Sequence, residues 1–218
     1  MLLESTLAGA SLMLALYTRP WRLLAHRTVP GTSTPQATPL LTPLLVTLVL
    51  LPWLWALPTL HAMPLQLQWS GACLVVLMLG WPLAVPVFLG VGAIAWAISP
   101  MGWAQALTCV VWLGIVPGSL ALLLGAVLRR LLGENLFVYV LGRAFLGTVA
   151  CVFVAGALAQ WSSQALPGVG ADLSLVARWL MAWGDGMLTG MLCAVFVAFR
   201  PDWLATWSDT LYLQPPAP

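Results

Sequence analysis

Charged side chains are scarce in this chain, and lysine is absent from it altogether. Of its 218 residues, 6% are charged and 61% are apolar. An average soluble domain has about 25% charged residues. The polar side chains are too few to cover a surface in water, which excludes a water-soluble globule. The surface must face lipid instead, so the sequence predicts an integral membrane protein.

Clusters of positive charge are missing as well. The formal net charge is +2 and the arginines are dispersed, which indicates neither a nucleic-acid-binding surface nor an amphipathic helix lying on a membrane. A phosphate-binding glycine loop is also absent from the sequence. Any ATP-driven work must therefore be done by another chain.

Cysteine occurs four times, but never with the paired spacing of a zinc or redox motif. Cys73, Cys109, Cys151 and Cys193 each lie in an apolar run and are expected to be buried as small hydrophobes. A basic stretch before the first apolar run is lacking too, and the arginines follow that run. This order is the reverse of a cleaved secretory signal, so we expect the run to remain as a membrane helix.

Long apolar runs are the main feature that is present. A membrane crossing needs about 20 residues, and five runs are long enough: 2–18, 39–60, 104–128, 136–160 and 175–199. A further run, 70–98, has 29 residues and contains Gly80, Pro82 and Pro86. Proline removes a helical hydrogen bond and clashes with the preceding turn, so the sequence predicts a helix broken at Gly80-Pro82.

The arginines decide whether residues 70–98 cross once or twice, because cytoplasmic loops carry the excess of positive charge. The relevant arginines are Arg19, Arg22, Arg27, Arg129, Arg130 and Arg200. With one crossing they divide equally between the two sides, and with two crossings they all fall on one side. We therefore expect a short segment over 70–81 and a second over 83–98. The short segment rises only about 18 Å, too little to cross alone, and must lie against protein.

The predicted fold is thus an all-α polytopic transmembrane bundle of six to seven helical segments. Residues 1–218 form a single integral membrane domain. The amino terminus is expected on the outer side of the membrane, in the periplasm, and the loop 19–38 and the tail 200–218 are expected in the cytoplasm.

Arg143 and Asp185 are the two ionisable residues that we single out within predicted spans. Buried charge in a membrane costs several kcal/mol unless it is paired, so both are candidates for a functional site. Tyr139 and Arg143 belong to a line of residues spaced by four, which places them on one helix face. Thr189 shares a face with Asp185, as does Arg178.

Two interpretations of the two charges remain open. In the first, Arg143 and Asp185 neutralise each other, or Arg143 extends to the cytoplasmic interface. In the second, Asp185 lines a polar cavity used by a solute or a proton, with Tyr139, Arg143 and Thr189 beside the path. Glycines at packing spacing are expected to allow close helix contacts: Gly114, Gly118, Gly186 and Gly190.

Catalytic motifs are lacking. The histidines, His26 and His61, have no serine or cysteine nucleophile beside them in sequence, and neither Gly-x-Ser-x-Gly nor His-Glu-x-x-His occurs. Asp185 is the only aspartate placed inside a span, so an aspartyl protease is not indicated. We expect no enzyme activity and no cofactor, with His61 as a weak candidate metal ligand.

Several segments carry a family resemblance. They read LGWPLA at 79–84, NLFVY at 135–139, RAFLG at 143–147, DGMLTGM at 185–191 and FRPDWLATW at 199–207. With these segments, residues 68–213 resemble the proteobacterial membrane proteins classed as energy-coupling factor transporter permeases, distant relatives of the cobalt and nickel capture subunits. Residues 1–67 match in hydropathy alone.

The resemblance implies a seven-helix subunit of a bacterial inner membrane that captures a small solute. It also implies two kinds of partner, a transmembrane coupling subunit and cytoplasmic ATPases. The metal-binding relatives begin Met-His and carry another histidine before the mid-chain break, whereas this chain has Leu2 and the stretch LQWSG at 67–71. We therefore expect no metal site of that kind. The alternative hypothesis is a structural or assembly subunit packed against a larger membrane enzyme or pigment complex.

Overall fold

The computed structural model describes residues 2–23, 39–61, 68–133, 135–162, 164 and 170–208. Within these ranges the regular structure is entirely helical, which confirms the predicted all-α bundle. The elements are α1 (Leu2–Tyr17), η1 (Pro20–Leu23), α2 (Leu41–Leu60), α3 (Ala72–Leu79), α4 (Trp81–Ile98), α5 (Trp103–Cys109), η2 (Val110–Ile115), α6 (Val116–Leu132), η3 (Val138–Leu146), α7 (Gly147–Trp161), α8 (Ala171–Phe199) and η4 (Pro201–Trp203).

Five helices in the described ranges are long and apolar enough to cross a membrane. They are Leu41–Leu60, Trp81–Ile98, Trp103–Leu132, Val138–Trp161 and Leu173–Phe199. Helix α1 is a shorter apolar helix of 16 residues. The chain is therefore a multi-pass membrane protein, and each apolar run predicted from the sequence contains a helix.

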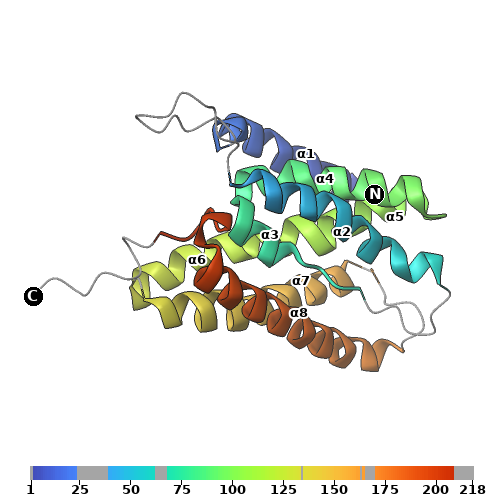
Figure 1. The fold of residues 1–218 in the computed structure, drawn as a ribbon. Helices are drawn as coiled ribbons and strands as arrows, with labels where there is room; N and C mark the ends of the chain where they lie inside the picture. The colour runs from blue at the N-terminus through green and yellow to red at the C-terminus, as the bar shows by residue number, and fades with distance from the viewer. Residues whose placement is uncertain are drawn as a thin grey trace, which may run out of the picture.

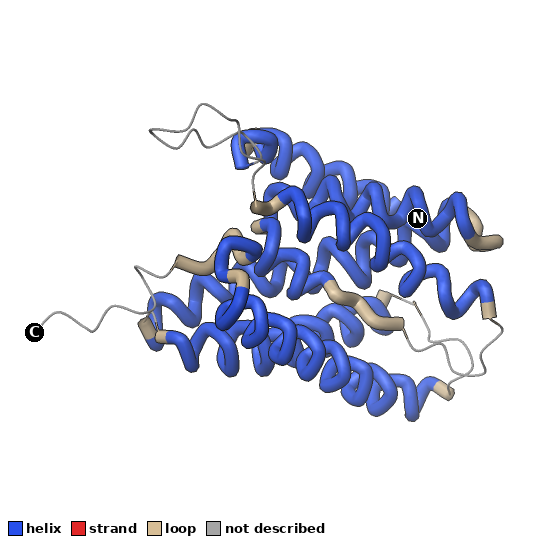
Figure 2. Tube along the Cα trace, in the orientation of Figure 1, coloured by secondary structure: helices blue, strands red, loops and turns tan. Residues whose placement is uncertain are grey.

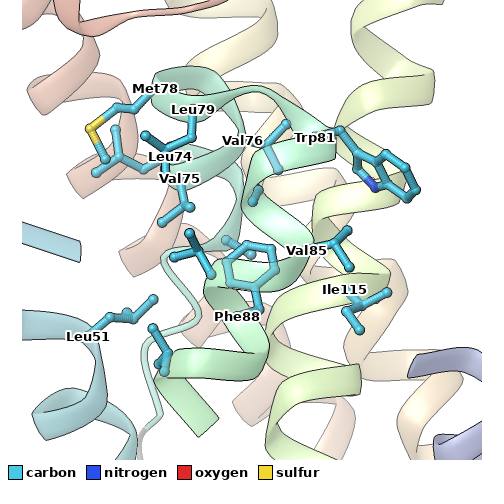
Figure 3. Close-up of a cluster of buried hydrophobic side chains, with 14 of the residues drawn as sticks. Leu51, Leu74, Val75, Val76, Met78, Leu79, Trp81, Val85, Phe88 and Ile115 are labelled. Atoms are coloured by element: carbon cyan, nitrogen blue, oxygen red, sulfur yellow. The ribbon is translucent and has the colours of Figure 1, made fainter. Parts of the chain in front are cut away.

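The long helices lie alongside one another and enclose the short helix α3 (Figures 1 and 2). Helices α1, α2, α4 and α5 lie on one side of it, and α7 and α8 lie on the other. All eight residues of α3 are buried. In Figure 3 its side chains Leu74, Val76 and Leu79 lie in an apolar cluster with Val85 and Phe88 of α4. A helix of about 12 Å can occupy this position because protein, not lipid, surrounds its ends.

The break in the run 70–98 falls at Gly80. Helix α3 ends at Leu79 and α4 begins at Trp81, with Pro82 in the first turn, where a missing N–H costs little. Gly80 has φ 76° and ψ 152°, a combination that is essentially restricted to glycine. The chain reverses direction there (Figure 1), so α3 and α4 form two separate segments, as the arginine positions predicted.

Replacing Gly80 by alanine is expected to lower the free energy of unfolding by about 1–3 kcal/mol, because alanine is strained at this φ and ψ. The added Cβ meets its nearest atom, in Pro82, at 3.9 Å, so steric contact adds nothing. The thermal midpoint of the purified protein measures the effect. Gly102→Ala is the matched control, since Gly102 has φ −69° and open space around a new Cβ. Equal midpoints for the two variants would contradict the assigned strain.

The arginines that the sequence analysis assigned to the cytoplasmic side, where the structure describes them, lie at one end of the bundle. Arg19 follows α1, Arg129 and Arg130 are in the last turn of α6, and Arg200 ends α8. The carboxyl ends of these three helices lie on the left in Figure 1. Arg27 and most of the loop 19–38 lie outside the described residues, as does the tail from residue 209 onward.

Two stretches depart from the regular α-helix that the sequence predicted. Val110–Ile115 and Val138–Leu146 are π-helices, in which the hydrogen bonds run from residue i to i+5. In the second, the N–H of Gly147 donates to the carbonyl of Gly142. A spacing of four residues is therefore less than a full turn in this stretch.

Candidate functional site

Asp185 lies in α8 with its carboxylate at the amino-terminal end of α3. Its side chain is 2% exposed. The N–H of Ser70 donates to Oδ2 at 2.9 Å, and the N–H of Gly71 donates to Oδ1 at 3.1 Å. The first N–H groups at a helix start have no partner within the helix, and Gly71 has no side chain that could cap them. Asp185 thus caps α3 from another helix.

Ser70 is held by three further hydrogen bonds. Its carbonyl accepts from Trp55 Nε1 at 3.3 Å, and its Oγ accepts from the N–H of Ala72 at 3.2 Å. The same Oγ donates to the carbonyl of Leu113 at 2.6 Å. That carbonyl is available because its α-helical donor would be residue 117, which is Pro117 and has no N–H. The non-helical entry to α3 is therefore fixed by α2, η2 and α8 together.

The carboxyl-terminal end of α3 is capped by residues 204–207, which we call the strap. The N–H of Ala205 donates to the carbonyl of Met78 at 2.9 Å, and the N–H of Thr206 donates to that of Leu77 at 3.3 Å. Thr206 Oγ1 also donates to Leu77 O at 3.0 Å. Unpaired carbonyls at a helix end thereby find donors. Both ends of α3 are thus satisfied by α8 or by the segment that follows it.

Tyr139 belongs to this strap contact. It is 1% exposed, and its hydroxyl lies 2.8 Å from Thr206 Oγ1 in a hydrogen bond. The Trp207 ring packs edge-on against the Tyr139 ring, with centroids 4.9 Å apart. The structure therefore places this predicted path residue at the strap and not beside Asp185.

Arg143 and Asp185 are both described, and no ion pair joins them. The guanidinium of Arg143 lies over the Tyr139 ring at 5.6 Å and against Gly125, and its Nε is buried without a hydrogen-bond partner. The interpretation that these two charges neutralise each other is corrected, because backbone N–H groups occupy both carboxylate oxygens.

Thr189 follows Asp185 by one helical turn and is fully buried. Its Oγ1 has no hydrogen-bond partner. Cys73 and Cys151 are both buried and free. The structure therefore brings Thr189 and Asp185 into one buried polar region and leaves Arg143 outside it.

The glycines lie where helices approach closely. A Cβ on Gly190 would meet Phe145 at 3.0 Å, and one on Gly186 would meet the Phe145 carbonyl at 3.1 Å. A Cβ on Gly114 would meet Phe88 at 3.0 Å, and one on Gly118 would meet Val76 at 3.1 Å. Gly186 and Gly190 thus allow α8 to pack closely against η3 and α7, and Gly118 allows α6 to pack against α3.

A cavity of about 50 Å³ adjoins the entry to α3. It is lined by Gln68, Ser70, Trp112, Leu113, Val152, Gly156, Arg178 and Met181. Arg178 Nη2 donates to the carbonyl of Gln164 at 2.6 Å, whereas its Nε is buried without a partner. Trp112 Nε1 is likewise buried without a partner. Sequence reasoning placed Arg178 on the face of Asp185 but did not name it as a site residue. The sequence signal that could have identified Arg178 is its position seven residues before Asp185, which places both on one helix face.

His61 ends α2 and is exposed. In the described ranges no group of three or more His, Cys, Asp or Glu side chains could hold a metal ion. No family model matches the chain, and neither a curated protein nor a solved structure matches it. The geometry around α3 therefore carries the functional inference.

Proposed function

We propose that this chain is a non-catalytic, solute-capture subunit of an energy-coupling factor type transporter. The observation that carries the proposal is the short helix α3, which begins inside the bundle beside a small cavity lined in part by Arg178. Solute sites of membrane transporters are built around such discontinuous helices, because the helix ends present polar backbone groups at membrane depth. Asp185 and Ser70 hold this helix start in place.

The proposed orientation follows from the arginine-bearing end of the bundle. Arg129, Arg130 and Arg200 lie there, and an excess of positive charge is typical of the cytoplasmic side. This charge distribution supports an orientation with the carboxyl terminus in the cytoplasm and the amino terminus in the periplasm of a bacterial inner membrane. The cavity then lies in the outer half, since Arg178 is about 10 Å from the start of α8.

Partners are required by the proposal, because the sequence has no phosphate-binding glycine loop. By the resemblance of residues 68–213, they are a transmembrane coupling subunit and cytoplasmic ATPases. A second candidate function is a structural or assembly subunit of a larger membrane complex. Apolar grooves of about 510 Å³ and 310 Å³ between η3 and α8 favour it, since they offer apolar surface to a partner helix.

Purification of the tagged full-length protein from its native membrane in mild detergent tests the two candidates. We expect a coupling subunit and ATPases to co-purify in fixed proportion, identified by mass spectrometry against an untagged strain. A fixed proportion of a membrane enzyme or pigment complex, with no ATPase, would contradict the transporter proposal and favour the structural one.

A further inference from the structure

Arg143 lies in a membrane-spanning segment, and the described part of the chain supplies no counter-charge for it. The span that contains it is Val138–Trp161. Within the described residues its guanidinium makes neither an ion pair nor a hydrogen bond, and its contacts are the Tyr139 ring at 5.6 Å and Gly125. An unpaired charge at membrane depth is costly, so a partner from outside the chain is favoured.

The outer nitrogens of this guanidinium are accessible. Nε is the one atom of the side chain that is buried without a partner, and the residue as a whole is half-buried. Nη1 and Nη2, which make no hydrogen bond to the described residues either, therefore reach the protein surface. Their N–H groups are donors that a guest with acceptor oxygens could use.

Gly125 of α6 forms a seat for the guanidinium. A Cβ at this position would meet Arg143 Nε at 2.6 Å and Cζ at 2.9 Å, so the side chain fits there because glycine has none. The Tyr139 ring lies on the guanidinium from the preceding turn of the same segment. The side chain is thus held in place and loses little further freedom on binding, which favours affinity.

The guanidinium lies close to the level of the lipid headgroups. Val138–Trp161 has 24 residues, about 36 Å of helix, and the hydrocarbon core is about 30 Å thick. Arg143 follows Val138 by five residues, about 7 Å. Its side chain extends back over Tyr139, toward the start of the span, as arginine side chains do when they reach for an interface.

Positive charge and exposed apolar side chains surround this position. Arg129 and Arg130 are exposed in the last turn of α6, and Arg129 lies one turn beyond Gly125 on the same helix face. The exposed apolar side chains of this part of α6 are Val127, Leu131 and Leu132. A phospholipid matches both properties, since its phosphate adjoins its acyl chains.

We infer that Arg143 binds the phosphate of an anionic phospholipid at the arginine-bearing end of the bundle, with Arg129 and Arg130 attracting the headgroup. A guanidinium is a planar fork of donors that matches phosphate oxygens. Phosphatidylglycerol is preferred over phosphatidylcholine, because the arginines repel the choline cation. The inference goes beyond the proposed function and does not depend on it, since a solute-capture subunit and a structural subunit can both hold a lipid here.

Native mass spectrometry of the purified full-length protein in detergent micelles tests the inference. The probes are dioctanoyl phosphatidylglycerol and dioctanoyl phosphatidylcholine, with inorganic phosphate as the competitor. We expect saturable binding of phosphatidylglycerol, about 5-fold or more tighter than that of phosphatidylcholine and unchanged by inorganic phosphate. Arg143→Gln should weaken phosphatidylglycerol binding about 10-fold or more, because it removes a charged donor.

Arg200→Gln is the matched control, because it also removes one arginine at this end of the bundle, and Arg200 is exposed. It should change phosphatidylglycerol binding about 2-fold or less, as expected for a screened surface charge. Gly125→Ala keeps every charge but displaces the guanidinium from its seat, so it should weaken binding as Arg143→Gln does. Thermal midpoints show that each variant is folded.

Equal binding of the two lipids by the original protein would overturn the inference, and this comparison needs no variant. Equal phosphatidylglycerol binding by Arg143→Gln and Arg200→Gln would mean an unspecific attraction to the arginine-bearing end and would overturn it too. Displacement of phosphatidylglycerol by inorganic phosphate would assign the site to free phosphate and reject the lipid.

Discussion

Replacing Asp185 by alanine is expected to lower the free energy of unfolding by about 2–6 kcal/mol. The variant leaves the N–H groups of Ser70 and Gly71 buried without an acceptor, and each such group costs about 1–3 kcal/mol. Asp185→Asn keeps one carbonyl oxygen and should lose about half as much. The thermal midpoint in nanodiscs reports the change.

The loss of stability in Asp185→Ala should first open the structure at α3. Cys73, in its first turn, is buried, so its reaction with a maleimide, located by mass spectrometry, should accelerate in Asp185→Ala. Asp202→Asn is the matched control, because Asp202 is exposed after α8, and it should leave both readouts unchanged. If Asp185→Ala has the same thermal midpoint and the same Cys73 reaction rate as Asp202→Asn, the carboxylate of Asp185 does not cap α3.

A double mutant separates capping from charge pairing. Since Arg143 contacts Tyr139 and not Asp185, adding Arg143→Gln should not rescue Asp185→Asn. The coupling between the two substitutions should stay below about 0.5 kcal/mol, as for independent sites. Rescue would restore the charge-pairing interpretation.

The second large effect is expected at the strap. Trp207→Ala should lower the free energy of unfolding by about 3–5 kcal/mol, the usual range for truncating a buried tryptophan. Trp207 is 9% exposed and packs on Tyr139. Its loss also loosens Thr206, which donates to the carbonyl of Leu77. Thermal midpoints measured in nanodiscs test this expectation.

Trp161→Ala is the matched control for the strap, because Trp161 at the end of α7 is 87% exposed. It removes the same ring without removing a packed contact. The expected order of midpoints is Trp207→Ala well below Trp161→Ala, with the latter near the original protein. The reverse order, or equal midpoints, would mean that the strap does not hold α3.

The membrane helices were predictable because they depend on local properties of the chain. Run length and apolar composition are enough to locate a span, and Gly80 with Pro82 marks a break. A short segment followed by a separate crossing helix, in place of one long crossing, followed from the arginine positions. These signals need no knowledge of which helices touch.

The capping arrangement was not predictable, because its partners are far apart in sequence. Asp185 stood out as a buried charge, yet the obvious partner for a carboxylate is a cation, and Arg143 was the available one. The actual partners are backbone N–H groups at 70 and 71, which every residue but proline carries and which leave no trace in composition. The π-helix over Val138–Leu146 was not predicted either, although Tyr139 and Arg143 do contact each other, as their spacing of four indicated.

The contacts of the segment after α8 could not be predicted from the sequence either. Its aromatic residues suit a membrane interface, and nothing in Trp207 or Thr206 alone indicates that they contact the end of α3. The cavity was missed for a related reason. Trp112 is one of 13 tryptophans in the chain, and only the fold brings it near Arg178.

Amide hydrogen exchange of the full-length protein in nanodiscs tests the central claim most directly, because it reports on the two hydrogen bonds themselves. The Ser70 and Gly71 amides should exchange slowly in the original protein and markedly faster in Asp185→Ala, which removes both acceptors, while amides of α2 stay unchanged. Fast exchange at Ser70 and Gly71 in the original protein, or equal rates in the variant, would contradict the capping of α3 by Asp185.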